Sequence, residues 1–329
     1  MRIGLAYDLK DDIEAGPNIP EDALEEYDSI KVVRAIARSL RALGHRTVYL
    51  GGGRKFLEKI LQSRLDFVFN IAEGRGSLRS REAQVPAVLE MLNIPYTGSD
   101  PLTLAITLDK PLAKQIACSA GVPTPPWIKI ASSAELEEVR ARDIPLPAFI
   151  KPAFEGSSKG IRLTSRVNTA VKACAAAQAL LDKYGQPVLM EKYIEGEEVT
   201  VGITGNSPPS IVGIMRVLPR KKFKTFVYSL EVKRDWRNLV DYECPARLER
   251  STLKRISEFS IKAYKALGCR DFARVDFRVA QDGTPYFLEV NPLPGLNPDS
   301  GDLPIMSYKM GWDYQRLIGT VLKAAIERY

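Results

Sequence analysis

Histidine and cysteine are scarce in this sequence, and their scarcity excludes several kinds of chemistry. The single histidine, His45, cannot build a histidine-rich zinc site, and it argues against a Ser-His-Asp triad. The four cysteines show no CxxC spacing, which predicts reduced, structural thiols; they are Cys118, Cys174, Cys244 and Cys269. Any chemistry must therefore rest on carboxylates, lysine, arginine, backbone amides and a hard metal ion.

Long apolar runs and basic tracts are also missing. No stretch approaches the ~18 apolar residues that a membrane span needs, so we expect no membrane partner. The first residues, MRIGLAYDL, lack the basic region and long apolar run of a secretion signal, and we therefore expect a cytoplasmic protein. The net charge of +7 is dispersed along the chain. This dispersal favours attraction of a small anionic substrate over binding of nucleic acid.

The first third of the chain alternates strand and helix patterns. Arg2–Tyr7 is predicted to be a strand, and apolar residues at helical spacing predict a helix over about Asp28–Leu43. The continuous apolar run Leu65–Ile71 is typical of a buried parallel strand. Together these patterns predict an α/β layer.

The remaining two thirds are predicted to be richer in strands. One apolar strand ends at Lys151 and another strand is predicted over Gly160–Ser165, while helices are predicted around Val171–Lys183 and Ser251–Leu267. With 329 residues the chain is long enough for two or three domains. Breaks such as GSDP and GVPTPP predict three parts, which are residues 1–104, 105–195 and 196–329.

A predicted hairpin, ARVDFRVAQDGTPYFLEVNPLPG, carries the strongest local signal. A two-residue turn at Asp282–Gly283 would place Asp276 opposite Glu289 and Arg274 opposite Asn291, with all four side chains on one face. Facing carboxylates repel each other, and a divalent cation removes that repulsion. Oxygen ligands of this kind suit Mg²⁺. The alternative is a solvated face on which arginines pair with the carboxylates. A bulge would shift the strand register, and these residues would then no longer face each other.

The opposite face of the same hairpin is expected to enter a core. The residues predicted there are Val275, Phe277, Leu288 and Val290.

A glycine–serine loop follows the strand that ends at Lys151. In FEGSSKGI, the backbone N–H groups of Gly156, Ser157, Ser158 and Gly160 could approach phosphate oxygens, because glycine permits close contact. The order GxxxxGK[ST] of a Walker A motif is absent, and so is the GxGxxG of a Rossmann fold. An ordinary hairpin loop is the alternative for this segment taken alone.

The segment MEKYIEGEEVTV offers a nucleotide-binding edge. A strand ends at Glu191–Ile194 with an aromatic side chain at Tyr193, and Glu198 begins the next strand within reach of a ribose diol. Without further context, a surface turn between strands would explain the same pattern.

Taken in order, these segments resemble the ATP-grasp superfamily and, within it, the D-alanine–D-alanine ligases. The resemblance extends over nearly the whole chain and rests on residues 92–114, 149–161, 188–203, 227–248, 273–279 and 287–300. It implies an ATP-grasp fold with an N-terminal parallel-sheet α/β domain and an α+β ATP-binding part. The implied activity is a carboxylate–amine ligation, in which ATP activates a carboxylate as an acyl phosphate and an amine then displaces phosphate.

The resemblance assigns the ATP site residue by residue. The ATP phosphates are expected to contact Lys110, Lys151, Lys233 and the loop Gly156–Gly160. The adenine and ribose are expected to contact Glu191, Lys192, Tyr193, Ile194 and Glu198. Here Glu191 would bond the adenine amino group and Glu198 would hold the ribose.

Metal, catalytic and acceptor residues follow from the same resemblance. Mg²⁺, with Mn²⁺ as an alternative, is expected to bind Asp276, Glu289 and Asn291. Catalytic roles are expected for Arg274, Gly295, Ser157 and Lys233. Of these, Arg274 and the Gly295 amide match the groups that stabilise the tetrahedral oxyanion. The carboxylate of the second substrate is expected to bind Ser300.

Three departures from the family lie in its substrate half. The N-terminal loop is rewritten, which places Glu25 near the role of binding the first amino group, with Ser29 as its partner and Glu26 as a rival. The family's His-Gly…Gly-Glu-Asp-Gly segment is replaced by AEGRGSLRSREAQ. In the expected lid, Arg234 stands where the family has a tyrosine that links to the serine matched by Ser157. On a strand-like lid, this arginine would favour a substrate with an extra acidic group, or form a latch with Glu25 or Glu26.

Several functions remain open at this point. A D-alanine–D-alanine ligase is the nearest named activity, and an amino-acid or dipeptide ligase with other substrates is an alternative. A phosphotransferase or carboxylase of the ATP-grasp superfamily is a further alternative, although the matches to Arg274, Gly295 and Ser300 argue against it. The expected partners are ATP and small amino-acid-like substrates, and the family suggests a homodimer.

Overall fold

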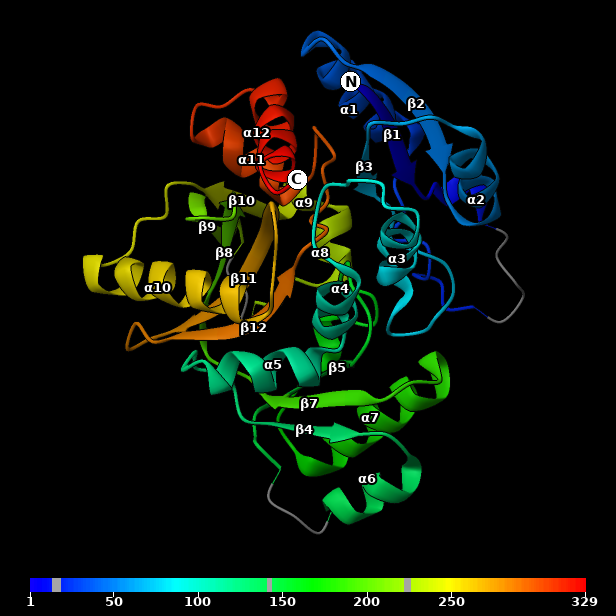
Figure 1. Cartoon of the computed structure of the whole chain (residues 1–329). Helices are drawn as coiled ribbons and strands as arrows, with labels where there is room; N and C mark the ends of the chain where they lie inside the picture. Colours follow the sequence, from blue (N-terminus) through cyan, green and yellow to red (C-terminus); the bar gives the residue numbers. More distant parts are fainter. Residues whose placement is uncertain (14–18, 141–143, 222–225) are drawn as a thin grey trace.

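The computed structural model describes residues 1–13, 19–140, 144–221 and 226–329. These residues form three sheets with helices packed against them (Figure 1). Each of the three parts predicted from the sequence contains one sheet, while the predicted boundaries themselves stay a prediction. Within the described ranges, no helix combines the length and the apolar character needed to cross a bilayer.

The first sheet is parallel and is covered by helices on both faces. Its strands lie in the order β2-β1-β3, with bounds β1 Arg2–Tyr7, β2 Arg46–Gly51 and β3 Phe67–Ile71. The helices of this layer are α1 (Ile30–Ala42), α2 (Gly53–Gln62) and α3 (Gln84–Met91), with 3-10 helices at Lys10–Asp12 and Arg81–Ala83. Side chains of β1 alternate, because Ile3 and Leu5 join the cluster with α1 while Ala6 joins the cluster with α2 and α3. The predicted α/β layer with a parallel sheet is confirmed.

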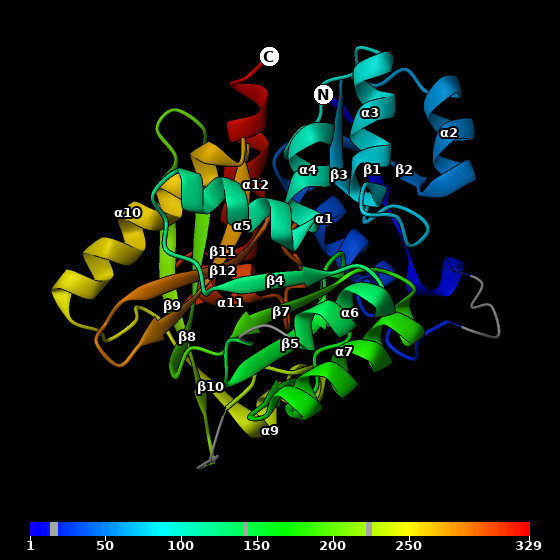
Figure 2. The ribbon, with the colours of Figure 1, turned by 90° about the horizontal axis from the view of Figure 1, so that it is seen from below.

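The second sheet is antiparallel and is covered on one face. Its strands lie in the order β4-β7-β5-β6, with bounds β4 Trp127–Ile130, β5 Ala148–Pro152, β6 Arg166–Val167 and β7 Val188–Lys192. Helices α6 (Ser133–Arg140) and α7 (Ala170–Tyr184) pack on it and lie in front of it when the molecule is seen from below (Figure 2). Residues 160–165, predicted as strand, instead contain a 3-10 helix at Leu163–Ser165.

The third sheet has five antiparallel strands in the order β10-β9-β8-β11-β12. Their bounds are β8 Gly196–Thr204, β9 Ser210–Pro219, β10 Val240–Glu243, β11 Phe272–Ala280 and β12 Pro285–Asn291. The helices of this part are α8 Leu230–Arg234, α9 Trp236–Leu239, α10 Arg250–Ala266, α11 Asp302–Lys309 and α12 Tyr314–Ile326. Helix α12 packs against α1, so the core of the N-terminal layer includes side chains from the far end of the sequence.

Two consecutive helices connect the layers and position a lysine. Helix α4 (Pro101–Leu108) ends before Asp109, whose side chain caps α5 (Lys110–Ser119) by accepting from the N–H of Leu112. Pro111 lies in the first turn of α5, where its missing N–H costs nothing. The break between the two helices at Asp109 therefore places Lys110 at the start of α5. Helix α5 runs between the four-stranded and five-stranded sheets (Figure 1).

The hairpin of β11 and β12 has the predicted pairs at the site but not the predicted turn. Asp276 faces Glu289 and Arg274 faces Asn291, whereas Phe277 faces Phe287. The loop is one residue longer than expected, because the N–H of Ala280 bonds to the carbonyl of Thr284, and a bulge after Asp276 corrects the register.

The bulge changes which side chain enters the core. Phe287 is fully buried against Phe277, and Leu288 lines a cavity instead of packing inward. The prediction that Leu288 lies in the core is therefore wrong. The expected lid also differs, because Lys233 and Arg234 lie on the short helix α8 and not on a strand.

Candidate functional site

Two adjoining cavities lie where the three sheets meet. The first cavity lies between the four-stranded and five-stranded sheets, with Lys151 on one wall and Asp276 on the other. The second cavity extends toward the N-terminal layer and is lined by residues 25–29 and by the loop that follows β12. The residues that line both cavities are Tyr228, Lys233, Arg274 and Asp302. Side chains at this boundary can therefore reach ligands on either side.

A buried lysine–glutamate–lysine cluster forms one wall of the first cavity. Glu191 Oε1 lies 2.7 Å from Lys151 Nζ, and Glu191 Oε2 lies 2.8 Å from Lys114 Nζ. Burial alone would raise the pKa of Glu191, but the two lysines outweigh it and lower that pKa. Burial lowers the pKa of Lys114 to about 8. The ion pair with Glu191 thus holds Lys151 in place. The expected hydrogen bond from Glu191 to adenine stays a prediction.

An arginine that the sequence argument missed closes one end of the first cavity. Arg278 lies 3.2 Å from Glu198 Oε2 and stacks on Tyr193, with its guanidinium carbon 4.6 Å from the ring centre. It also donates to the carbonyl of Ile194, at 2.9 Å. Strand alternation could have found it, because Arg278 lies two residues beyond Asp276 on β11. Arg278 therefore orders the segment expected to hold adenine and ribose.

The hairpin carboxylates lie together at the inner end of the first cavity. Glu289 Oε2 is 3.0 Å from Lys110 Nζ, and Asp276 Oδ2 accepts from Asn291 Nδ2 at 3.1 Å. Burial alone would raise the pKa of Glu289, but Lys110 and Lys151 hold it well below its ordinary value. Glu289 is thus available as an anionic oxygen ligand, and the carboxylate of Asp276 and the amide oxygen of Asn291 offer further oxygen atoms beside it. This set fits a hard divalent cation.

Arg274 connects the hairpin to the second cavity. Its guanidinium forms a two-point contact with Asp276, with Nη2–Oδ2 at 2.8 Å, and its Nη1 donates to Asp302 Oδ2 at 2.9 Å. Gly295 and Ser300 line the second cavity together with Arg274. The structure therefore brings together the predicted groups for the oxyanion and for the second carboxylate.

The glycine–serine loop has a backbone that can bind an anion. Ser157 and Ser158 have φ values of 51° and 59°, in the left-handed region that few non-glycine residues adopt. Gly160 has φ of 72°, and a Cβ there would lie 2.4 Å from Cγ of Pro152. Ser157 lines the second cavity and Ser158 lines the first, so the loop spans the boundary between the two cavities.

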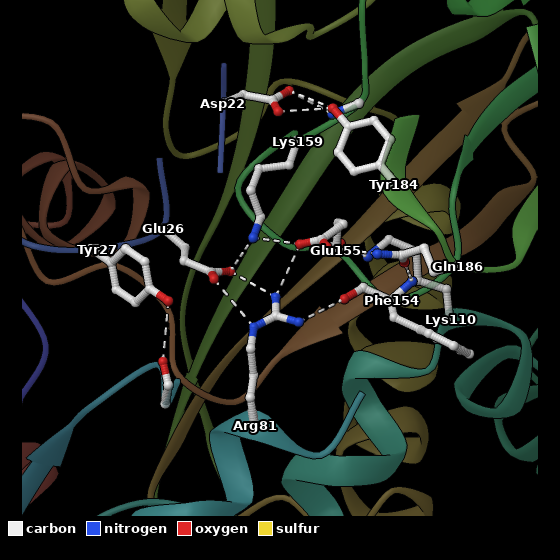
Figure 3. A network of polar contacts seen from close by, with 12 residues as sticks. Asp22, Glu26, Tyr27, Arg81, Lys110, Phe154, Glu155, Lys159, Tyr184 and Gln186 are labelled. Carbon is white, nitrogen blue, oxygen red and sulfur yellow. Dashed lines mark hydrogen bonds and ion pairs between the residues drawn. The ribbon is translucent and has the colours of Figure 1, made fainter. Parts of the chain in front are cut away.

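A buried ion-pair network ties this loop to the N-terminal layer (Figure 3). Arg81, which is 1% exposed, lies 2.8 Å from Glu26 and 3.2 Å from Glu155. Lys159 lies 2.8 Å from Glu26 and also pairs with Glu155. The carbonyl of Glu155 accepts from Lys110. The network therefore joins the loop, the N-terminal layer and the lysine at the start of α5.

Residues 116–323 match the family model described as D-ala D-ala ligase C-terminus, which is more than half of the chain. This chain belongs to the D-alanine–D-alanine ligase family. It is accordingly an ATP-grasp ligase of the ADP-forming, carbon–nitrogen class, and the predicted fold is confirmed. The comparisons give no support to a phosphotransferase or a carboxylase.

Relatives and solved structures match along nearly their whole length. The D-alanine–D-alanine ligase of Aquifex aeolicus is 33% identical and the alignment includes 89% of this chain and 94% of that one. An uncharacterized protein of Sinorhizobium fredii is 31% identical, over 91% of this chain and 88% of its own. A D-alanine–D-alanine ligase from Bacillus anthracis, solved with ATP, has a TM-score of 0.74 at 25% identity, with 100% and 98% of the two chains aligned. The VanG D-Ala:D-Ser ligase of Enterococcus faecalis has a TM-score of 0.75 at 20% identity over 98% and 99% of the two chains, which supports the fold alone.

The departures of this ligase from its family meet at the rim of the second cavity. Arg234 Nη2 lies 2.6 Å from Glu25 Oε1, so the lid helix is latched to the N-terminal loop by the first of the two predicted pairs. Glu26 does not take part in that latch, because it is held by Arg81 and Lys159. Ser29 precedes α1 and lines the second cavity without capping the helix through its side chain.

Besides Arg278, four site residues of this ligase were not predicted from the sequence. They are Arg81, Lys114, Glu155 and Lys159. Lys114 could have been found, because it lies four residues after Lys110 on one helix face. Arg81 and its partners could not, because their contacts join segments 55 and 74 residues apart.

Proposed function

We propose that this ligase activates the carboxylate of one amino acid with ATP and joins it to the amino group of a second amino acid. D-alanine is the first substrate to test, since relatives named D-alanine–D-alanine ligase are 30–33% identical to this chain. The proposal includes Mg²⁺, or Mn²⁺ in its place, bound by Asp276, Glu289 and Asn291. It also includes a cytoplasmic location and a homodimeric assembly, as the family suggests.

The observation that carries the proposal is the position of the hairpin carboxylates between two sets of cations. Glu289 contacts Lys110 on the phosphate side, at 3.0 Å, and Asp276 contacts Arg274 on the acceptor side, at 2.8 Å. In the described part of the chain, no three His, Cys, Asp or Glu side chains are grouped to hold a metal ion. Nucleotide phosphates would complete the coordination, as is usual for Mg²⁺.

The residues of the chain supply positioning and charge. Lys110, Lys151 and the loop Gly156–Gly160 would hold the phosphates in line with the attacking carboxylate, and the metal ion would neutralise phosphate charge. Arg274 and the N–H of Gly295 would stabilise the oxyanion that develops when the amine attacks the acyl carbon. Breaking the acyl–oxygen bond then releases orthophosphate. No step needs a histidine, in agreement with the composition.

The test is ADP and orthophosphate release across a matrix of D- and L-amino acids, with nucleotide products separated by chromatography. We expect release that depends on amino acids, with no AMP. Glu289→Ala should abolish turnover, because it removes one of the three proposed metal ligands. Glu258→Ala on the exposed face of α10 is the matched control and should keep full activity.

Two results would overturn the proposal. AMP and pyrophosphate as the main products would mean adenylation of the carboxylate. Substantial ATP-dependent activity in Glu289→Ala would remove the metal assignment.

A further inference from the structure

Within the ranges that the structure describes, three carboxylates on the wall of the second cavity make no hydrogen bond or ion pair with a cation. Asp28 precedes α1, Glu73 follows β3, and Glu82 lies in the 3-10 helix Arg81–Ala83. Glu82 is only 8% exposed. Among the residues that the structure describes, none of the three side chains is joined to another group by a hydrogen bond or an ion pair. A carboxylate as buried as Glu82 normally has such a partner, so this wall is unusual.

The neighbouring carboxylates make the contrast clear. Glu25 is paired with Arg234 at 2.6 Å, and Glu26 is paired with both Arg81 and Lys159 at 2.8 Å. These two glutamates were the candidates for the substrate amino group, and both already have partners inside the protein. The anionic groups left available to a ligand are therefore Asp28, Glu73 and Glu82.

The environment of the three groups favours their neutral forms when no ligand is bound. Burial raises the pKa of Glu82 to about 7 and that of Asp28 to about 7. Burial, followed by repulsion from Glu82, raises the pKa of Glu73 well above its ordinary value. A cation placed among them would offset both effects, because its attraction favours the charged form of a carboxylate.

The three carboxylates do not form a metal site. In the described residues, no three acidic, histidine or cysteine side chains converge closely enough to coordinate a metal. Asp28 and Glu73 also line a small recess beside Gly295, the residue whose N–H is expected at the reacting acyl group. A cation held there would belong to the amino acid undergoing ligation.

We propose that Asp28, Glu73 and Glu82 form a subsite for a cationic side chain, so that this ligase prefers a diamino acid over alanine as one of its two substrates. The inference rests on the proposed ligase function and narrows its substrate class. The α-ammonium group of an ordinary amino acid would neutralise one of these carboxylates, whereas the second ammonium group of a diamino acid could pair with another. The family's histidine-containing segment is replaced in this chain by the segment that supplies Glu73 and Glu82.

The main experiment compares diamino acids with neutral amino acids, and 2,4-diaminobutyrate and norvaline are the matched pair because they differ only in a terminal ammonium or methyl group. ADP release is measured with 2,4-diaminobutyrate, ornithine and lysine, and with neutral alanine and norvaline, each as D and L forms. We expect kcat/KM at least tenfold higher for one diamino acid than for norvaline. Glu73→Gln and Glu82→Gln should remove that preference through KM for the amino acid, with KM for ATP unchanged. Glu58→Gln, on α2, is the matched control and should keep the preference.

Two further measurements separate failure of the subsite from failure of the ligase function. Calorimetric binding of the same amino acids, in the presence of a non-hydrolysable ATP analogue, tests the subsite even if no turnover occurs. Diamino-acid binding that is lost in Glu73→Gln supports the subsite, and equal binding of norvaline overturns it. Thermal unfolding tests the missing contacts, because a neutral side chain avoids the cost of burying the Glu82 charge, so Glu82→Gln should be at least as stable as the wild type. A clearly lower Tm would mean that Glu82 has a partner and would also overturn the inference.

Discussion

Arg81 is the residue whose removal should cost the most stability outside the apolar core. Its side chain is 1% exposed, and it donates to Glu26 at 2.8 Å, to Glu155 at 3.2 Å and to the carbonyl of Phe154 at 3.0 Å. Arg81→Met keeps much of the volume but removes the charge. Two buried glutamates would then face Lys159 alone, which leaves one uncompensated negative charge.

Removing one partner from a buried ion pair typically costs ~3–5 kcal/mol, and we expect a loss of about this size in the free energy of unfolding. Urea denaturation of Arg81→Met against wild type measures it. The matched control is Arg79→Met, because the side chain of Arg79 is 58% exposed and makes a single ion pair with Asp109. That pair should be worth only ~0–1 kcal/mol.

A double-mutant cycle tests the reason for the loss. Replacing Glu26 by glutamine in the Arg81→Met background removes the uncompensated charge, so the double variant should be more stable than the sum of the single losses predicts. A loss below ~1 kcal/mol for Arg81→Met, or strictly additive effects in the cycle, would refute the account of the network. The KM for ATP should rise in Arg81→Met, because the network holds the glycine–serine loop.

Three further predictions follow from other contacts. Lys114→Met should raise the KM for ATP, because Glu191 would lose one of its two buried lysine partners and hold Lys151 less firmly. Direct nucleotide titration tests this, and an unchanged affinity for ATP would contradict it. Arg234→Tyr should change stability by less than ~1 kcal/mol, because its pair with Glu25 is half exposed, yet it should alter the KM values for amino acids with little effect on that for ATP. Because burial raises the pKa of Glu82 to about 7, the folded protein retains a proton between about pH 4.5 and 7 that the unfolded chain has lost. Its contribution to stability should therefore decline as pH rises through this window, and urea denaturation at several pH values should show a smaller decline in Glu82→Gln.

Local patterns were sufficient to predict the residue pairs of the hairpin at the site, whereas the ATP contacts follow from the family resemblance and stay a prediction. Alternation along β11 and β12 placed Asp276 and Glu289 on one face, and the structure pairs them as expected. The longer turn and the bulge were not predictable, because each alters the register by one residue and the two cancel at the site. Leu288, at the bulge, is the residue whose position differs from the prediction, because it lines the cavity and not the core.

The substrate half depends on contacts that no local pattern encodes. Glu25 and Glu26 are adjacent, and their different roles are set by Arg234 and Arg81, which lie far away in the sequence. The lid was expected to be strand-like, but residues 230–234 form a helical turn whose Leu230 and Val232 are buried. Burial of these two side chains in the tertiary structure therefore outweighed the local preference for a strand.

The packing of α12 against α1 affects how the chain can be made and rearranged. One face of the parallel sheet needs Leu317, Ile318 and Val321 to complete its core, and these residues are translated roughly 250 residues after β3. At about 5–20 residues per second, a ribosome would need on the order of 12–50 s to supply them. During that time the N-terminal layer has an uncovered apolar face, and we expect it to mature only after α12 has been synthesised. An exchange of substrate halves between relatives should therefore succeed only when α12 is exchanged together with residues 1–104.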